Sequence, residues 1–142
     1  MKLKNFSISN EAYANEISAF EQLWDLHNIA SFDGFQQDFQ QDTFELNWHI
    51  DPEYASQKYP ANSFAILFRD VKFLEITPRD SDMPKLEDIC LSSVSGVLPN
   101  EKLARNPDTI EGQEFHLLFK FQSELTIRVG AKSAEFILRD SP

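Results

Sequence analysis

The feature that most constrains this chain is an alternation of apolar and polar residues over several short stretches. From residue 43 to residue 50, every second side chain is large and apolar: Phe44, Leu46, Trp48 and Ile50. Successive side chains of a β-strand point to opposite faces of a sheet, so this period of two predicts a strand with one buried face. Further stretches that predict strands are FAILFRD, DICLSSVSGVL, FHLLFKF and LTIRV.

The stretch FAILFRDVKFLEITP leaves little room for a turn between its two apolar patterns. Val71 and Phe73 share one parity, while Leu74 and Ile76 share the other. Such a slip in phase is explained by a β-bulge, or by a strand that is covered on both faces.

A hairpin near the carboxy terminus can be assigned a register. A two-residue turn would place Phe121 across from Glu124 and mix the two faces. A three-residue loop over residues 122–124 keeps every apolar side chain on one side of the hairpin. The resulting pairs are Phe121 with Leu125, Phe119 with Ile127, and Leu117 with Val129.

The same logic predicts a second turn over residues 130–133. The chain would then end in a three-stranded antiparallel meander. The pairs across this second turn would be Val129 with Ala134, Ile127 with Phe136, and Leu125 with Leu138.

Apolar residues near the amino terminus recur with a helical period instead. Tyr13, Ile17, Phe20 and Trp24 are spaced by four, three and four residues, which is the stripe of an amphipathic helix. Turn-forming residues at 31–34 would end this helix. The FQQDFQQD stretch that follows repeats a four-residue unit and predicts a short helix or an extended arm.

Together these elements predict one α+β domain over the 142 residues. The amino-terminal helix would pack on a curled, mainly antiparallel sheet of about six strands that ends in the three-stranded meander. A sandwich of two sheets is the alternative layout. Regular crossover helices do not separate the strands, which argues against a doubly wound parallel sheet.

Charge is distributed very unevenly along the chain. No lysine or arginine occurs between Lys4 and Lys58, and the thirteen acids outside that interval balance all thirteen bases, so one segment carries the whole net charge of −10. Nucleic acid is disfavoured as a partner because neutralising phosphates requires clustered bases. The acids of this segment are Glu11, Glu16, Glu21, Asp25, Asp33, Asp38, Asp42, Glu45, Asp51 and Glu53.

Aromatic residues interleave with these carboxylates, as in a surface where charge accelerates encounter and rings hold the complex. We therefore expect a basic protein partner to meet residues 21–53. Two tyrosines in the following loop would add rigid amphipathic contacts if they are exposed. The alternative is that the acids only keep the protein dissolved and that both tyrosine rings fold onto the sheet edge. The candidate partner-binding residues are Asp25, Asp33, Asp38, Asp42, Tyr54 and Tyr59.

Residues suited to catalysis or metal binding are few. His27, His49 and His116 fall in different expected elements, and the single cysteine, Cys90, cannot anchor a thiolate zinc site. His49 and His116 occupy polar positions of their strands, so we expect both on a solvated face. Isolated glycines exclude a phosphate-binding loop and a dinucleotide fingerprint, and DSDMPKLED lacks the glycine of a calcium loop. We expect no cofactor, no metal and no catalytic residue.

The composition also bears on the compartment. Cys90 has no second cysteine to bond with, and the first residues, MKLKNFSISNEAYANE, contain no apolar signal core. No apolar run approaches the ~20 residues that a membrane-spanning helix needs. These features favour a cytoplasmic protein.

The succession DTFELNWHI, FAILFRDVKFLEITPRD and FHLLFKFQSELTIRVGAKSAEFIL resembles the strand layout of small acidic immunity proteins from bacterial toxin systems, over roughly residues 42–139. The resemblance implies a non-enzymatic protein that binds and blocks a toxin, but it carries over no functional residue. The sequence therefore predicts a protein-binding domain that engages a basic partner through its acidic surface. The alternative is a small-molecule-binding or catalytic domain with a cavity in the curled sheet.

Overall fold

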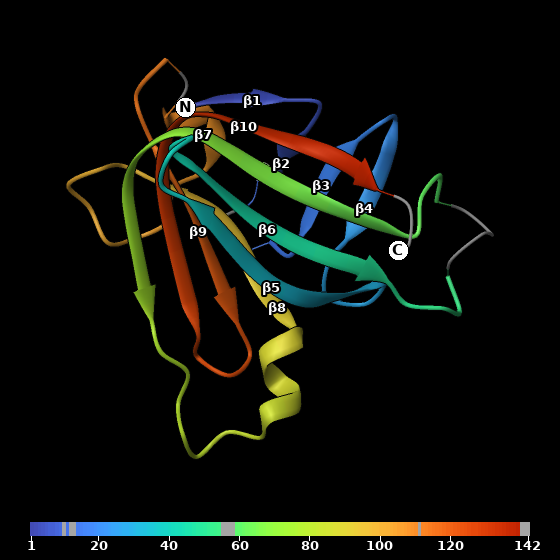
Figure 1. Cartoon of the computed structure of the whole chain (residues 1–142). Coiled ribbons are helices and arrows are strands. Elements are labelled where there is room, and N and C mark those ends of the chain that lie inside the picture. The colour runs from blue at the N-terminus through green and yellow to red at the C-terminus, as the bar shows by residue number, and fades with distance from the viewer. Residues whose placement is uncertain (10, 12–13, 55–58, 111, 140–142) are drawn as a thin grey trace.

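The computed structural model describes residues 1–9, 11, 14–54, 59–110 and 112–139, and these residues form an almost entirely β structure (Figure 1). A 3-10 turn and one short helical turn are the only helical elements in these ranges. The elements are β1 (Lys2–Lys4), β2 (Ser7–Ile8), β3 (Glu16–Ala19), β4 (Gln22–Asp25), β5 (Ala30–Asp38), β6 (Thr43–Ile50), β7 (Ser63–Thr77), η1 (Lys85–Ile89), β8 (Leu91–Val97), α1 (Pro107–Ile110), β9 (His116–Phe121) and β10 (Thr126–Arg139).

Two sheets contain all the described strands. The larger is a curled antiparallel sheet in the order β5-β6-β7-β10-β9-β8, with β1 added parallel to β10. The smaller is an antiparallel sheet of β2, β3 and β4. Figure 1 shows β7 and β10 bending together along their length, which gives the larger sheet its curl.

The expected amino-terminal helix is wrong, and with it the α+β class. Ile17 lies in β3 and Trp24 in β4, two strands of the smaller sheet, and the two residues are direct cross-strand partners. Phe20 and Glu21 connect these strands, and both have positive φ, 52° and 60°. Tyr13, the first residue of the expected helical stripe, lies outside the described residues.

The helical spacing arose because a tight hairpin returns the chain after two residues. Ile17 and Trp24 are seven residues apart, which is two helical turns, yet they meet across the hairpin and both are fully buried. The Trp24 indole N–H donates to the Ala19 carbonyl at 3.0 Å. The interval from one buried residue to the next therefore matched a helix by coincidence.

The FQQDFQQD stretch is extended rather than helical. Its first half completes β5, and the chain then turns tightly into β6. The residues expected to end a helix instead form a bulge in β5, where the register with β6 shifts between Phe32 and Gly34. Gly34 has a φ of 121°, a conformation that favours glycine, so the turn-like composition marks this bulge.

The expected strand at residues 43–50 is confirmed as β6, with Phe44, Leu46, Trp48 and Ile50 all buried. β7 is one continuous strand, and the slip in its apolar phase is a bulge. Gly130 of β10 pairs with Phe73, and the next residue, Ala131, pairs with Val71. One residue of β7 is therefore extra at this point, which reverses the parity of the residues beyond it.

The expected register of the carboxy-terminal hairpin is confirmed. β9 and β10 pair Phe119 with Ile127 and Leu117 with Val129, and the Phe121 N–H donates to the Leu125 carbonyl at 2.9 Å. The expected third strand is wrong, because β10 continues without a turn through residues 130–133. A meander does form, but its strands are β8, β9 and β10.

The β10 strand continues because it has partners along its whole length. β7 pairs with it on one side from Thr126 to Arg139. On the other side, β9 pairs with its first residues and β1 pairs with Ser133, Ala134 and Glu135. The GAKS composition suggested a turn, but it falls where the strand changes from one neighbour to the next.

The smaller sheet closes the concave side of the larger one. Trp24 of β4 packs against Phe64 of β7 and Phe136 of β10, with ring centroids 5.4 Å and 5.0 Å away. Phe32 of β5 reaches Phe121 of β9 at 4.5 Å, so the two halves of the curled sheet meet through their side chains. The buried apolar residues of both sheets form one core cluster.

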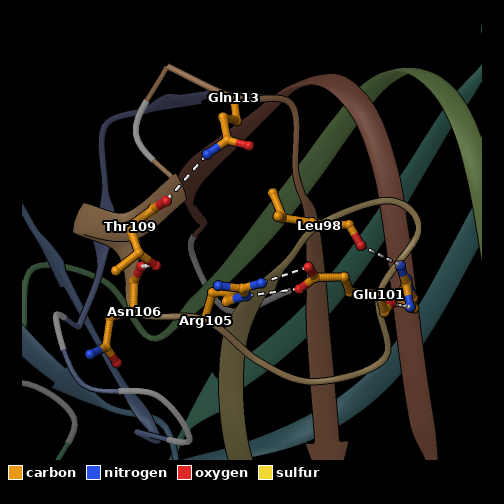
Figure 2. Close-up of polar contacts among 7 residues, drawn as sticks. Leu98, Glu101, Arg105, Asn106, Thr109 and Gln113 are labelled. Atoms are coloured by element: carbon orange, nitrogen blue, oxygen red, sulfur yellow. Dashed lines mark hydrogen bonds and ion pairs between the residues drawn. The ribbon is translucent and has the colours of Figure 1, made fainter.

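The outer edge of β8 is covered by other segments. The Val94 N–H donates to the Ala14 carbonyl at 2.8 Å, and the Arg105 N–H donates to the Gly96 carbonyl at 2.8 Å. The Arg105 side chain donates two hydrogen bonds to the Glu101 carboxylate, at 2.8 Å and 2.6 Å (Figure 2). The loop that follows β8 thus folds back along it.

Candidate functional site

The β5–β6 hairpin places three of the candidate acids along one margin of the molecule. Asp33 lies at the β5 bulge, Asp38 ends β5, and Asp42 precedes β6. All three side chains are exposed. The sequence therefore located an acidic surface, although it did not foresee that a strand and a tight turn would present it.

Two of these acids also shape the hairpin turn. Asp38 accepts hydrogen bonds from the backbone N–H groups of Gln40 and Gln41, at 3.0 Å and 3.1 Å. Asp42 has a φ of 55°, a left-handed conformation that Asp and Asn tolerate better than most residues. Its carbonyl accepts the Val71 N–H at 3.2 Å, which ties the turn to β7.

Two phenylalanines accompany the acids. Phe39, in the turn, is 84% exposed, and Phe35, in β5, is 45% exposed. The Phe35 ring contacts the Phe44 ring at 5.3 Å, whereas no ring contact involves Phe39 among the described residues. A large apolar side chain left this open can anchor another molecule, because its burial would release surface from water.

A hollow of about 580 Å³ lies on the outer face of the sheet beside the turn. Gln36 and Glu45, cross-strand partners on β5 and β6, both line it. Glu45 is almost fully buried and forms an ion pair with Arg139. The full lining is Gln36, Gln37, Asp38, Phe39, Gln40, Thr43, Glu45 and Leu67.

A polar cluster occupies the other end of the same two strands. The Nδ1 atom of His49 lies 2.7 Å from Asp33 Oδ1, and its Nε2 atom lies 3.9 Å from Asp51 Oδ1. The Ser31 hydroxyl donates to Asp51 at 2.8 Å. His49 is thus on a solvated face, as expected, but its two neighbours are carboxylates of the acidic segment. Ser31 donates to Asp51 and not to His49, so the cluster lacks the arrangement of an activated nucleophile.

The remaining candidate residues form a second group, beside β4. Asp25 caps the following turn by accepting hydrogen bonds from the backbone N–H groups of His27 and Asn28, both at 3.1 Å. The Tyr59 ring packs on Trp24 with centroids 4.8 Å apart. Burial, followed by the charge of Asp25, raises the pKa of Tyr59 above its usual value, so the phenol stays neutral at physiological pH. Tyr54 is 37% exposed.

One polar cluster was missed from the sequence. His116 was expected on a solvated face, but it is 8% exposed, and its ring stacks on Phe73 with centroids 4.7 Å apart. Arg128, also 8% exposed, donates from Nε to His116 Nδ1 at 2.9 Å. The polar parity was read correctly, but a loop covers this part of the outer face.

That loop is held by the rest of the guanidinium. Nη1 of Arg128 donates to the Glu101 carbonyl, and Nη2 donates to the carbonyls of Leu98 and Pro99. Burial, followed by the charge of Arg128, lowers the pKa of His116, which remains a neutral acceptor at neutral pH. The β9–β10 register places His116 and Arg128 on the same face, but nothing in the sequence marked the backbone carbonyls of residues 98–101 that accept the other hydrogen bonds of Arg128.

The described residues hold few other groups suited to metal binding or catalysis. No group of three or more His, Cys, Asp or Glu side chains there is arranged to hold a metal ion. Cys90 is a free thiol whose pKa is raised by burial and then by nearby carboxylates, which disfavours the reactive thiolate. None of the helices among the described residues is long and apolar enough to cross a membrane.

Comparison of the chain with protein families, with curated proteins and with solved structures finds no significant match.

Proposed function

We propose that this protein is a non-enzymatic binding domain whose acidic β5–β6 hairpin engages a basic protein partner. The observation that carries the proposal is the joint exposure of Asp33, Asp38 and Asp42 beside Phe35 and Phe39 on one hairpin. Charges that act together accelerate the encounter with an oppositely charged surface, and buried rings then slow dissociation.

The sequence around the hairpin supports a positive charge on that partner. No base occurs between Lys4 and Lys58, so the hairpin and its neighbours present carboxylates without cations from their own segment. The strand layout noted above, which resembles that of acidic immunity proteins, adds a toxin as one kind of basic partner. That resemblance supports the class of function and assigns no residue.

The test begins with capture of the partner from the native host at low salt. Replacing Asp33, Asp38 and Asp42 together with asparagine should cut the association rate several-fold at low salt, and less at high salt, because ions screen the charges over a Debye length of ~8 Å near physiological strength. Asparagine keeps the acceptor oxygen that caps the turn and tolerates a positive φ. The melting temperature should therefore barely change.

A matched control removes three exposed charges that lie outside both hollows beside β5. The substitutions Glu11→Gln, Glu75→Gln and Glu114→Gln take the same net charge from exposed residues that line neither hollow. Stopped-flow measurements at two ionic strengths should show a larger effect for the hairpin variant than for this control. Equal association rates for the hairpin variant and the unaltered protein would contradict the proposal.

A further inference from the structure

The β5 strand has a neighbour on one side only. It pairs with β6 along its length and stands at the end of the larger sheet, with no other described strand beside it. Near the bulge the edge faces η1, whereas the residues from Gln36 to Asp38 lie beyond it. Backbone donors and acceptors at such an edge are available to another strand.

The side chains along this edge oppose self-association. Protein edges are commonly protected by charge, and here the charges are carboxylates only: Asp33 and Asp38 on the strand and Asp42 in the turn. Two copies that met edge to edge would place these carboxylates close together, which like charge disfavours. A strand that carries lysine or arginine would meet the same edge with attraction.

The two faces next to the edge differ in chemistry. Phe32 and Phe35 pair with core residues of β6. They line a hollow of about 290 Å³ together with Ile89, Leu125 and the Arg79–Asp88 ion pair. Gln36 and Asp38 point to the opposite face, which holds the hollow with Glu45 described above. Alternate side chains of an added strand would enter these two hollows in turn.

We propose that the partner contributes an extended segment of alternating basic and apolar residues, which pairs with β5 as an additional strand. The basic side chains lie toward Asp38, and the apolar side chains lie toward Phe35, Ile89 and Leu125. Main-chain hydrogen bonds supply affinity in this binding mode, and the alternate hollows supply specificity. The inference rests on the proposed function and adds the conformation and the residue pattern of the partner.

The probe is a short synthetic peptide that alternates lysine with valine and can pair with β5 beyond η1, over residues 36–38. Its binding to the full chain is measured by calorimetry and by shifts of the backbone amide signals. We expect shifts concentrated on β5, and weaker binding by the variant with Asp33, Asp38 and Asp42 changed to asparagine. A peptide with its lysines and valines grouped rather than alternating should bind more weakly.

Two N-methylated peptides separate strand pairing from charge attraction. In an added strand the N–H groups of alternate residues point toward β5, so methylating only the lysine amides or only the valine amides blocks pairing in one peptide and spares it in the other. One isomer should bind at least about tenfold more weakly than the parent, and the other should bind like the parent.

Equal binding by both isomers, no binding of the parent at low salt, or a dimer of the chain that pairs through β5 would overturn the strand-addition inference. None of these results decides the proposed function, whose own test is the association rate of the captured partner with the asparagine variant. A partner that depends on the three acids while both methylated isomers bind alike would leave a charged surface without strand addition.

Discussion

The two edges of the larger sheet are treated in opposite ways. At the β8 edge, backbone groups of Val94 and Gly96 are bonded by two other segments, and Arg128 holds the loop after β8 in place. At the β5 edge, no described strand or loop pairs with Gln36 to Asp38, and carboxylates and phenylalanines surround them. One sheet thus closes one edge with its own chain and leaves the other available.

The difference shows where each kind of polar group is used. The base at the closed edge, Arg128, is buried and directs its donors to His116 and to loop carbonyls. The acids at the open edge have carboxylate oxygens in solvent, and their hydrogen bonds only shape a turn or reach an exposed histidine. A buried network serves the fold, whereas exposed charge contributes little to stability and is free to act on partners.

The largest expected effect comes from a substitution in the core, which supports both edges of the sheet. Phe119 is fully buried, with ring contacts to Trp48 of β6 and Phe68 of β7. Phe119→Ala should lower the free energy of unfolding by ~3 to 5 kcal/mol, as loss of a buried aromatic ring usually does. Chemical denaturation measures the change. A loss below ~1 kcal/mol would show that the site collapses around the missing ring or that the ring is not in the core.

A substitution at Gly130 should have a smaller effect on stability, and it should disturb mainly the closed edge. A Cβ added at Gly130 would lie 2.6 Å from the ring of His116 and 3.1 Å from Phe73. Gly130→Ala should therefore cost ~1 to 3 kcal/mol through overpacking, and should displace the histidine that Arg128 bonds. Lys132→Ala, at an exposed position of the same strand, is the control and should change stability by less than ~0.5 kcal/mol.

The outcome for Gly130→Ala can be read at each edge by hydrogen exchange. Faster exchange should appear in the loop held by Arg128, with β5 unchanged. Equal acceleration at both edges would mean that the two edges are not independent.

What the sequence predicted well lies where short loops join strands of clear period. The β9–β10 register followed from keeping Phe119 and Ile127 on one face, because a shift by one residue would expose the whole apolar set. The acidic surface was also predictable, since charge can be read directly from composition.

The failures occurred where contacts distant in sequence decide the structure. Phe20 and Glu21 form a two-residue turn without the Asn or Gly that such turns favour, so nothing marked the β3–β4 hairpin. At Gly130 the chain continues because β7, β9 and β1 supply partners, and a local turn signal cannot reveal those partners. His116 is buried by a loop whose position depends on Arg128.

A pH effect tests the His116–Arg128 contact more gently than a clash does. The pKa of His116 is lowered in the folded protein, first by burial and then by Arg128, whereas Glu114 acts in the opposite direction and the amino terminus adds to the lowering. The unfolded chain then binds the proton more tightly. The neutral His116 therefore contributes its full stability when the pH is above its pKa in the unfolded chain, about 6.5. This contribution is lost as the pH falls from there toward the lower pKa of the folded protein.

The control for this pH effect is His116→Gln, which keeps an acceptor for the Arg128 donor but does not titrate. Denaturation between pH 7.5 and pH 5 should show less loss for this variant than for the unaltered protein. Identical pH profiles would indicate that His116 titrates alike in both states. We expect this loss to be smaller than that of Gly130→Ala, because only one group changes its charge.

The smallest expected effect concerns the outermost tie of the closed edge. Arg105→Gln removes the paired hydrogen bonds to Glu101 that Figure 2 shows, but it leaves the backbone bond to Gly96 and the hold of Arg128 on the loop. The pair is largely exposed, so the melting temperature should hardly move. The Arg105 amide should exchange its hydrogen a few-fold faster, since the loop opens locally more often. Lys102→Gln removes the same charge from the same loop, where Lys102 makes no ion pair with any described residue, and should leave that amide unchanged.

In the unaltered protein and in both variants, the amides of Gln36 to Asp38 that do not bond to β6 should exchange faster than that of Val94. Slow exchange there would show that the β5 edge is covered in solution, and the contrast between the two edges would then fail.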